Sequence, residues 1–336
     1  MIPHLVLPPL VALTAPAVML NWGSGPPLPA ALDHHATFVT TAPDGPVLHV
    51  AGGNDYRQQF AAHWTAAVRP DGTLGDWRDA EPLPGPLAGH TVLVVGGVAV
   101  LLGGQHPGRQ NTAEVYTARV RDDGTVGGWQ AAPGLPAPRF HHAAVAAGTY
   151  VFVIGGLEAM TSTNTVFRAE VRSDGTLGPW LTLDTLPHAR SHQGIVVHSG
   201  AIYQIGGLEG NPAGANRPLR DVIRARLGAD GGLGAWEEVG HLDSAVATHA
   251  AFTYAGYLYV AGGVENNRRF TDAVHRAPVL TNGSLGPWEP LPPLPAARGH
   301  VHHLPVIRGA VYSAGGSQPG RHVIPEVFVG RLQEPQ

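Results

Sequence analysis

The stretch YVFVIGG at residues 150–156, with DGTLGPW after it at 174–180, contains the two features that decide the fold of this chain. The first feature is an apolar run that ends in two glycines, and the double glycine recurs at 52–53, 103–104, 155–156, 206–207, 262–263 and 315–316. The second is a tryptophan that follows an Asp-Gly or Asn-Gly turn, and it recurs at Trp77, Trp129, Trp180, Trp236 and Trp288. Two independent markers that stay in phase along nearly the whole chain indicate a repeat architecture.

Each repeat has the pattern of four short strands. A short glycine-containing turn precedes the second strand, as in AAGTYVFVIGG at 146–156. The Asp-Gly or Asn-Gly pair between the third and fourth strands favours a tight hairpin, because both residue types tolerate a positive φ. Repeats of four strands over about 50 residues are the blades of a β-propeller. We therefore predict an all-β fold with six four-stranded antiparallel blades.

The two ends of the chain complement each other. The sixth repeat stops at EVFVGRLQEPQ (326–336), after its third strand. Near the other end, Trp22 lies 12 residues before His34, as Trp288 lies 12 residues before His300. This match predicts that an N-terminal strand joins the last blade and closes the ring, which removes two exposed sheet edges. Residues 18–336 are then one six-bladed domain.

The first 17 residues, MIPHLVLPPLVALTAPA, form an apolar segment with two interpretations. Its end, Ala15-Pro16-Ala17, resembles a signal-peptidase site, but no Lys or Arg precedes the apolar run and Pro8-Pro9 interrupts it. The alternative is a proline-rich lead-in packed on the domain. The segment is too short and too rich in proline to span a bilayer. The sequence leaves a secreted or periplasmic location as open as a cytoplasmic one.

Composition excludes several classes of chemistry. The chain has no cysteine, and all 21 of its basic residues are arginine. Disulfides, thiolate metal sites, lysine Schiff bases and the P-loop lysine are therefore excluded. The net charge of −4 gives no reason to expect a nucleic-acid partner. The hydrolase motif G-x-S-x-G and the zinc-protease motif HExxH are also absent.

The repeats resemble those of the kelch family of β-propellers. The shared features are the double glycine, the spaced tryptophan, and the Pro138-Arg139-Phe140-His141 entry to a first strand, and the resemblance covers residues 18–332. It implies the fold but not the function, since kelch-type propellers include adaptors, sugar-processing enzymes and copper oxidases. The copper oxidases' thiol–tyrosine cofactor needs a cysteine, and the glutamate–aspartate–histidine iron triad of some plant kelch proteins is absent. We expect no cofactor.

In a propeller, two sets of loops meet on one face near the central channel. The loops into the first strands carry Arg139, Arg190 and Arg298, whereas blades one, two and five lack this arginine. The loops after the double glycines carry Arg57, Arg109, Arg268 and Arg321, together with Glu158, Glu209 and Glu265. Either these charges pair with one another on a solvated rim, or the arginines converge and bind an anionic group.

Histidines also recur at roughly matching places, namely His34, His90, His141, His192, His249 and His300. Such a ring could bind a metal ion, because neutral imidazole is a common ligand of zinc and copper. The alternative is that the histidines cap turns in every blade and lie too far apart across the channel to share an ion. We expect the second and predict no metal site, with His141, His192 and His300 contributing to ligand binding only.

These observations predict a non-enzymatic, monomeric propeller that binds a protein or glycan through its Arg- and His-rich loop face. The ligand would be an anionic small molecule, a glycan or an acidic peptide. The alternative is a small-sugar enzyme resembling the sialic-acid mutarotases of kelch-type fold. That enzyme would use glutamate–histidine acid–base chemistry, with an arginine holding a carboxylate. Its site would involve the longest loop, GLEGNPAGANRPLRD at 207–221.

Overall fold

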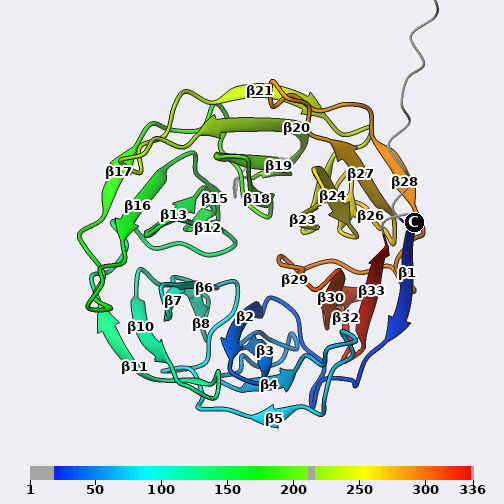
Figure 1. The fold of residues 1–336 in the computed structure, drawn as a ribbon. Coiled ribbons are helices and arrows are strands. Elements are labelled where there is room, and N and C mark those ends of the chain that lie inside the picture. Colours follow the sequence, from blue (N-terminus) through cyan, green and yellow to red (C-terminus); the bar gives the residue numbers. More distant parts are fainter. Residues whose placement is uncertain (1–18, 211–215, 334–336) are drawn as a thin grey trace, which may run out of the picture.

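The structure is a computed structural model that describes residues 19–210 and 216–333. The prediction for residues 1–17 concerns a segment outside these ranges. Within them the chain forms strands and turns without a helix, so no helix of the length and apolar character needed to cross a membrane is present there. Six four-stranded antiparallel sheets lie around a central axis, as Figure 1 shows in a view along that axis.

The strands of the first three blades run from the axis to the rim. Blade one contains β2 (Ala36–Ala42), β3 (Gly45–Ala51), β4 (His63–Ala67) and β5 (Arg78–Asp79). Blade two contains β6 (Thr91–Val95), β7 (Val98–Leu102), β10 (Val115–Val120) and β11 (Val126–Ala132). Blade three contains β12 (Ala143–Ala147), β13 (Tyr150–Ile154), β16 (Val166–Glu170) and β17 (Leu181–Leu183).

The other three blades have the same order. Blade four contains β18 (Gly194–His198), β19 (Ala201–Glu209), β20 (Arg217–Arg226) and β21 (Glu237–His241). Blade five contains β23 (Ala250–Tyr254), β24 (Tyr257–Ala261), β27 (Val274–Pro278) and β28 (Glu289–Leu291). Blade six contains β29 (Val306–Ile307), β30 (Ala310–Ala314), β33 (Val327–Gln333) and β1 (Met19–Ser24).

Short strands follow the double glycines and form the loop face. They are β8 (Gln105–His106) with β9 (Gln110–Asn111), β14 (Leu157–Glu158) with β15 (Thr161–Ser162), and β31 (Ser317–Gln318) with β32 (His322–Val323). In blade five, β22 (Val246–Ala247), β25 (Val264–Glu265) and β26 (Arg269–Phe270) form a three-stranded sheet.

The N-terminal strand β1 is the outer strand of blade six. It pairs antiparallel with β33, with Leu20 opposite Leu332 and Trp22 opposite Gly330. This is the pairing expected from the position of Trp22 in the repeat. Figure 1 shows β1, at the blue end of the chain, beside the red β33.

The core lies between neighbouring blades. The second strands are almost fully buried because both of their faces contact other blades, and Val98–Leu102 is buried along its whole length. The repeating tryptophans pack at these contacts. The indole N–H of Trp180 donates to the Pro133 carbonyl oxygen of the preceding blade at 2.8 Å, and that of Trp77 donates to Pro26 at 2.9 Å.

The double glycines are the points at which one blade touches the next. Gly155 and Gly156 have φ values of 62° and 96°, which residues with a Cβ rarely adopt. The Gly156 N–H donates to the Arg190 carbonyl oxygen of blade four at 2.8 Å. A Cβ on Gly156 would lie 2.7 Å from the Cβ of His142. Glycine is therefore required here for both conformation and space.

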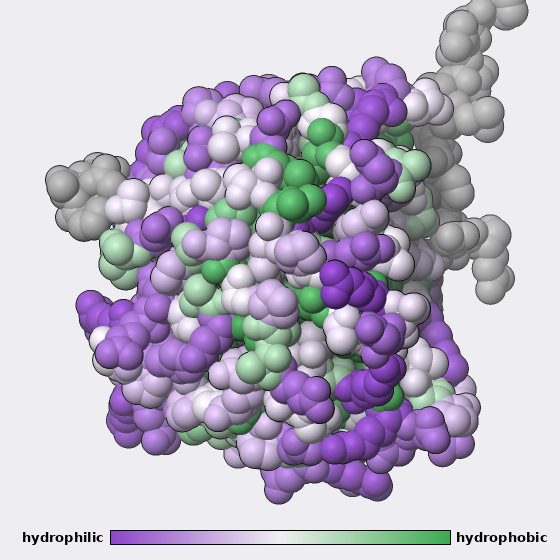
Figure 2. All heavy atoms as spheres, turned by 90° about the vertical axis from the view of Figure 1, so that its left-hand side faces the viewer, coloured by the Kyte–Doolittle hydropathy of each residue, from purple (hydrophilic) through white to green (hydrophobic). Residues whose placement is uncertain are grey.

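One side of the outer wall of the ring has a mixed surface. Figure 2 shows the side of the molecule on which β10, β16 and β17 lie in Figure 1. Hydrophobic residues appear there as small patches separated by hydrophilic ones. This side of the wall presents no broad apolar surface.

Candidate functional site at the channel mouth

A closed ring of backbone hydrogen bonds surrounds the channel axis. One residue from each blade takes part, and each N–H donates to the carbonyl oxygen of its neighbour over 2.8–3.3 Å. The members in ring order are His34, Gly89, His141, His192, Thr248 and His300. All six have a positive φ between 50° and 63°. Because these bonds link the backbones of all six blades directly, the channel is narrow at this level. Side chains from opposite blades therefore lie close together.

The ring also corrects the alignment of the histidines. His90 and His249 follow ring members Gly89 and Thr248, so they belong to a second position, one residue further along the chain. His35 and His142 occupy this second position in their own blades. We call His35, His90, His142 and His249 the outer histidines; they are at most 7% exposed. Burial lowers their pKa values, to about 3 for His90 and to about 4 for His249.

The outer histidines are structural, but they pack against the backbone and do not cap turns, since none of their ring nitrogens has a hydrogen-bond partner among the described residues. The imidazole of His90 lies so close to Gly52 that a Cβ there would be 2.5 Å from it, and the imidazole of His142 lies similarly against Gly103. They fill the space beside the double glycines of the preceding blade. In blade four Gln193 takes this position, and its amide donates to the Ile154 carbonyl oxygen at 2.9 Å.

The remaining histidines gather at the axis. His34, His141, His192 and His300, joined by His302, are called the axial histidines below. Ring centroids are 4.0 Å apart for His141 and His192, 4.1 Å for His34 and His300, and 4.6 Å for His34 and His141. His302 lies 5.9–6.3 Å from three of them. His34 and His192 come from opposite blades, and a ring nitrogen of one lies within 4.8 Å of a ring nitrogen of the other. The expectation that these histidines lie too far apart across the channel is therefore wrong.

Neighbouring polar groups orient the axial rings. The Nδ1 atom of His34 lies 2.7 Å from the Asp33 carboxylate, which is fully buried. Nδ1 of His192 lies 2.9 Å from the Ser191 hydroxyl, and Nδ1 of His300 lies 2.6 Å from that of Ser317. Burial and the adjacent imidazoles lower the pKa of His192 to about 3, and lower those of His141 and His300 well below the usual range. These imidazoles are neutral at physiological pH.

A pocket of about 520 Å³ lies over this cluster. We call it the arginine pocket because Arg57, Arg109 and Arg321 line it. The other lining residues are His34, Asn54, Tyr56, Gln58, Gln59, Ala88, Gln105, Pro107, Gly108, Phe140, His141 and Met160. No carboxylate is among them, and the three arginines form no ion pair within the described residues. The three guanidinium groups give the lining a positive formal charge, and the nearby Asp55 carboxylate accepts from the backbone N–H groups of Arg57 and Gln58.

Two of these arginines, Arg109 and Arg321, lie in turns of the same geometry. Arg109 and Arg321 each end a Pro-Gly-Arg tripeptide, with φ values of 63° and 60° after a glycine near 80°. The guanidinium carbon of Arg321 lies 6.0 Å from the centroid of the Tyr56 ring. Burial and the charge on Asp33 raise the pKa of Tyr56 to about 12, so its hydroxyl stays protonated. The pocket thus presents cationic and neutral donors.

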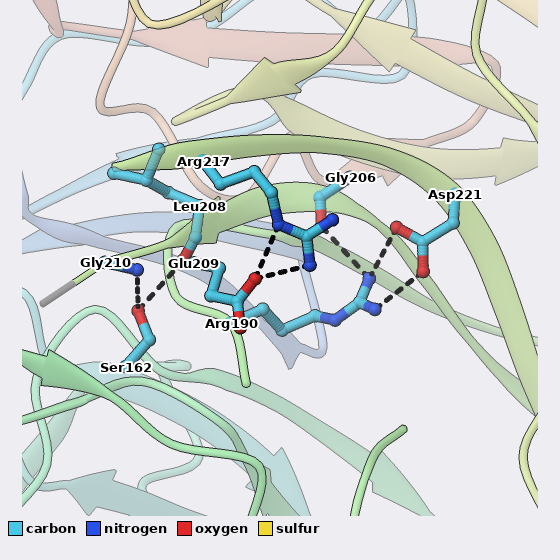
Figure 3. A network of polar contacts seen from close by, with 8 residues as sticks. All are labelled: Ser162, Arg190, Gly206, Leu208, Glu209, Gly210, Arg217 and Asp221. Carbon is cyan, nitrogen blue, oxygen red and sulfur yellow. Dashed lines mark hydrogen bonds and ion pairs between the residues drawn. The ribbon is translucent and has the colours of Figure 1, made fainter. Parts of the chain in front are cut away.

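Arg139, Arg190 and Arg298 do not reach this pocket, contrary to prediction. They are only 0–2% exposed and lie inside their blades. Arg190 donates to the Gly206 carbonyl oxygen and pairs with Asp221 at 2.7 Å, as Figure 3 shows. Arg139 pairs with Glu158 at 2.8 Å, and Arg298 donates to the carbonyl oxygens of Ser313 and Gly315. Each guanidinium group is buried and bonded within its own blade, so it is unavailable to a dissolved anion.

The three predicted carboxylates pair with arginines outside the pocket. Glu158 binds Arg139, Glu209 binds Arg217, and Glu265 binds Arg269. Figure 3 shows the Glu209–Arg217 pair in front of Arg190. None of the three neutralises Arg57, Arg109 or Arg321. Arg268 is exposed and does not line the pocket.

The sequence analysis missed three parts of this site. Asp33 and Tyr56 lie outside the residue types that were compared between blades. His302 is an additional histidine in the blade-six entry RGHVHH (298–303), one that the other blades do not have at this point. This additional histidine could have been recognised from the sequence as a departure from the repeat. Residues 211–215 of the long blade-four loop lie outside the described ranges.

Comparisons with known proteins agree with this architecture. No family model matches the chain. Kelch-like protein 34 of Homo sapiens is 32% identical over 158 residues, which cover 44% of this chain and 23% of that protein. Kelch-like protein terF of Aspergillus terreus is 25% identical over 225 residues, which cover 62% of this chain and 47% of that protein. The chain thus spans less than half of the length of these curated relatives.

A solved structure has the same fold. The structure of YjhT superposes with a TM-score of 0.72 at 13% identity, covering 92% of this chain and 99% of YjhT. Identity at this level establishes the fold alone. The ring of four-stranded sheets defines a β-propeller, and together with the curated relatives it identifies the class of repeat. The chain is a kelch-repeat β-propeller, as its double glycines and tryptophans predict.

Proposed function

We propose that this propeller is a non-enzymatic binding protein that holds an anionic group of a glycan or acidic peptide in the arginine pocket. The observation that carries the proposal is the pocket's charge. Three arginines line it, no carboxylate does, and Glu158, Glu209 and Glu265 pair elsewhere. Arginine binds carboxylates through paired hydrogen bonds, so a carboxylate is the group that this lining favours.

The surroundings of the arginines support binding of a small rigid group. Tyr56 and the amides of Gln58, Gln59 and Gln105 add neutral donors and acceptors to the lining. A volume of about 520 Å³ accommodates a monosaccharide acid or the end of a peptide. Phe140 and Met160 provide apolar surface, and Met160 is 49% exposed. The proposed organisation is a monomer with one domain over residues 18–336.

The test compares two charge-matched triple variants by calorimetry. A panel of sugar acids and acidic peptides is titrated into wild type, Arg57→Ala/Arg109→Ala/Arg321→Ala, and the control Arg78→Ala/Arg172→Ala/Arg226→Ala. The control removes three exposed arginines outside the pocket lining. We expect the pocket variant to lose at least about tenfold in affinity and the control to keep it. Wild-type binding should weaken as salt rises from about 50 to about 500 mM. Equal affinities for all three proteins would refute the proposal.

A second candidate function is the small-sugar enzyme, and one observation favours it. The buried Asp33 carboxylate contacts Nδ1 of His34, and His34 lines the pocket, so the pair has the form of an oriented general base. The predicted glutamate–histidine pairing is absent from the pocket. The His106–Glu114 contact of 2.9 Å lies among other residues. NMR observation of sugar-anomer exchange, with His34→Gln as the comparison, tests this function.

A further inference from the structure

Four of the five axial histidines are members of the backbone ring, but the ring does not require an imidazole. Gly89 and Thr248 hold the same ring positions in blades two and five and make the same N–H donations. Thr248 is β-branched, yet it adopts a φ of 58° there. The ring therefore forms without imidazoles, and the imidazoles of the other four blades need a separate explanation.

Their nitrogen atoms lie within range of a shared ion. One ring nitrogen from each of His34, His141 and His192 lies within 4.8 Å of those of the other two. Zinc-bound nitrogens are about 2.0–2.1 Å from the metal, so two of them in a tetrahedral site are about 3.4 Å apart. Small rotations about side-chain bonds close such a gap. Asp33, His34 and His300 form a second, overlapping group.

The hydrogen bonds around these rings leave one nitrogen free on each. Because Nδ1 of His34 contacts Asp33 and Nδ1 of His192 contacts Ser191, Nε2 of both remains available. A carboxylate behind a ligating histidine is the usual outer partner in metal sites, where it fixes the tautomer. The half-buried His141 has a buried Nδ1 without any hydrogen-bond partner among the described residues, and so has Nε2 of His302.

The charge balance also favours a cation. Asp33 is fully buried, and its Oδ2 atom makes no hydrogen bond among the described residues, although Nδ1 of His300 lies 3.7 Å away. A buried carboxylate oxygen without a partner is costly, and a cation nearby would offset that cost.

We propose that His34, His141 and His192 bind one divalent transition-metal ion of the zinc, copper or cobalt type. Imidazole ligands without thiolates or clustered carboxylates favour these metals over magnesium and calcium. Asp33 acts as a positioning residue behind His34, and His300 and His302 lie beside the site. His34 and His141 also line the arginine pocket. The open coordination position therefore faces the pocket.

The test uses tag-free protein stripped with a chelator and titrated with Co²⁺, whose visible absorption reports its coordination. Wild type should bind one Co²⁺ per chain, and Zn²⁺ should displace it while Mg²⁺ and Ca²⁺ should not. His141→Gln/His192→Gln should lose at least about 100-fold in affinity. The matched control His90→Gln/His249→Gln removes two outer histidines and should bind as wild type does. Asp33→Asn should weaken binding by about 10- to 100-fold without changing the number of ions bound.

Three outcomes overturn the proposal. One is wild-type protein that develops no Co²⁺ absorption at micromolar metal, a result that does not depend on any variant. Another is absorption that persists in folded His141→Gln/His192→Gln, which would place the ion at other histidines. The third is equal loss in the axial and outer variants, which would indicate a general effect on the fold. Circular dichroism of each variant establishes that it is folded.

Discussion

His141 and His142 are adjacent in the chain and belong to different regions of the molecule. The ring of His141 faces other imidazoles at the axis and lines the arginine pocket, whereas that of His142 is buried against a double glycine of the preceding blade. The arginines divide in the same way, with Arg190 inside a blade and Arg109 in the pocket. The difference teaches that position in the repeat, rather than residue type, separates structural residues from candidate ligand-binding residues.

Acidification should produce the largest effect, because it acts on buried histidines of both regions. Folded-state pKa values of about 3 for His90 and His142 lie below the unfolded value of about 6.5. Below pH 6.5 the unfolded chain therefore binds more protons. Stability is complete above that pH and falls by up to about 1.4 kcal/mol per pH unit for each such histidine. Melting temperatures from pH 7.5 to pH 4 should decline steeply. A melting temperature that is flat over this range would contradict the account.

The next largest effect is expected where an outer histidine meets a double glycine. Gly156→Val should destabilise the fold by more than about 3 kcal/mol, because valine combines a positive φ with a clash against His142. Gly148→Val is the matched control, since it has a φ of 60° but open space around a Cβ. Urea unfolding measures both. Similar losses for the two variants would show that conformation alone, without packing, sets the requirement for glycine.

A smaller contrast is expected between the two kinds of arginine. Arg190→Ala removes the partner of Asp221 inside blade four and should cost about 3 kcal/mol. Arg109→Ala changes an exposed side chain and should stay within about 0.5 kcal/mol of wild type. The double variant Arg190→Leu/Asp221→Asn should be more stable than Arg190→Ala. The reason is that blades one and two have leucine, Leu32 and Leu87, at the position equivalent to Arg190. No recovery in urea unfolding would argue against the pairing as the cause.

The fold was readable from the sequence because its markers repeat. The double glycines and tryptophans sit at positions that every blade needs, so six copies reinforce one interpretation. The site was harder to predict because it depends on departures from the repeat. Leu32, Leu87 and Val246 occupy the position of Arg139, and all three are buried. This apolar substitution identifies the position as interior, and the sequence analysis treated it only as a break in the pattern.

The histidines were misjudged for a related reason. His141 is a member of the backbone ring, whereas His90 lies one residue after the ring member Gly89. Sequence spacing alone does not reveal this offset of one residue, because Gly89 and Thr248 replace histidine in the ring. The width of the channel depends on backbone hydrogen bonds between blades, which no single repeat contains. Asp33 and His302 occur once, so periodicity does not identify them. Residues that belong to one site, and do not recur in the six blades, can be identified as part of that site only from the assembled structure.

The most direct test of the distinction between the axial and the outer histidines is an anomalous difference map at the zinc edge, from crystals grown with Zn²⁺. Our account predicts one strong peak on the axis, about 2.1 Å from ring nitrogens of His34, His141 and His192. It predicts no peak beside His35, His90, His142 or His249. An axis without a peak, or a peak at the outer histidines, would contradict the assignment of the channel mouth as the binding region.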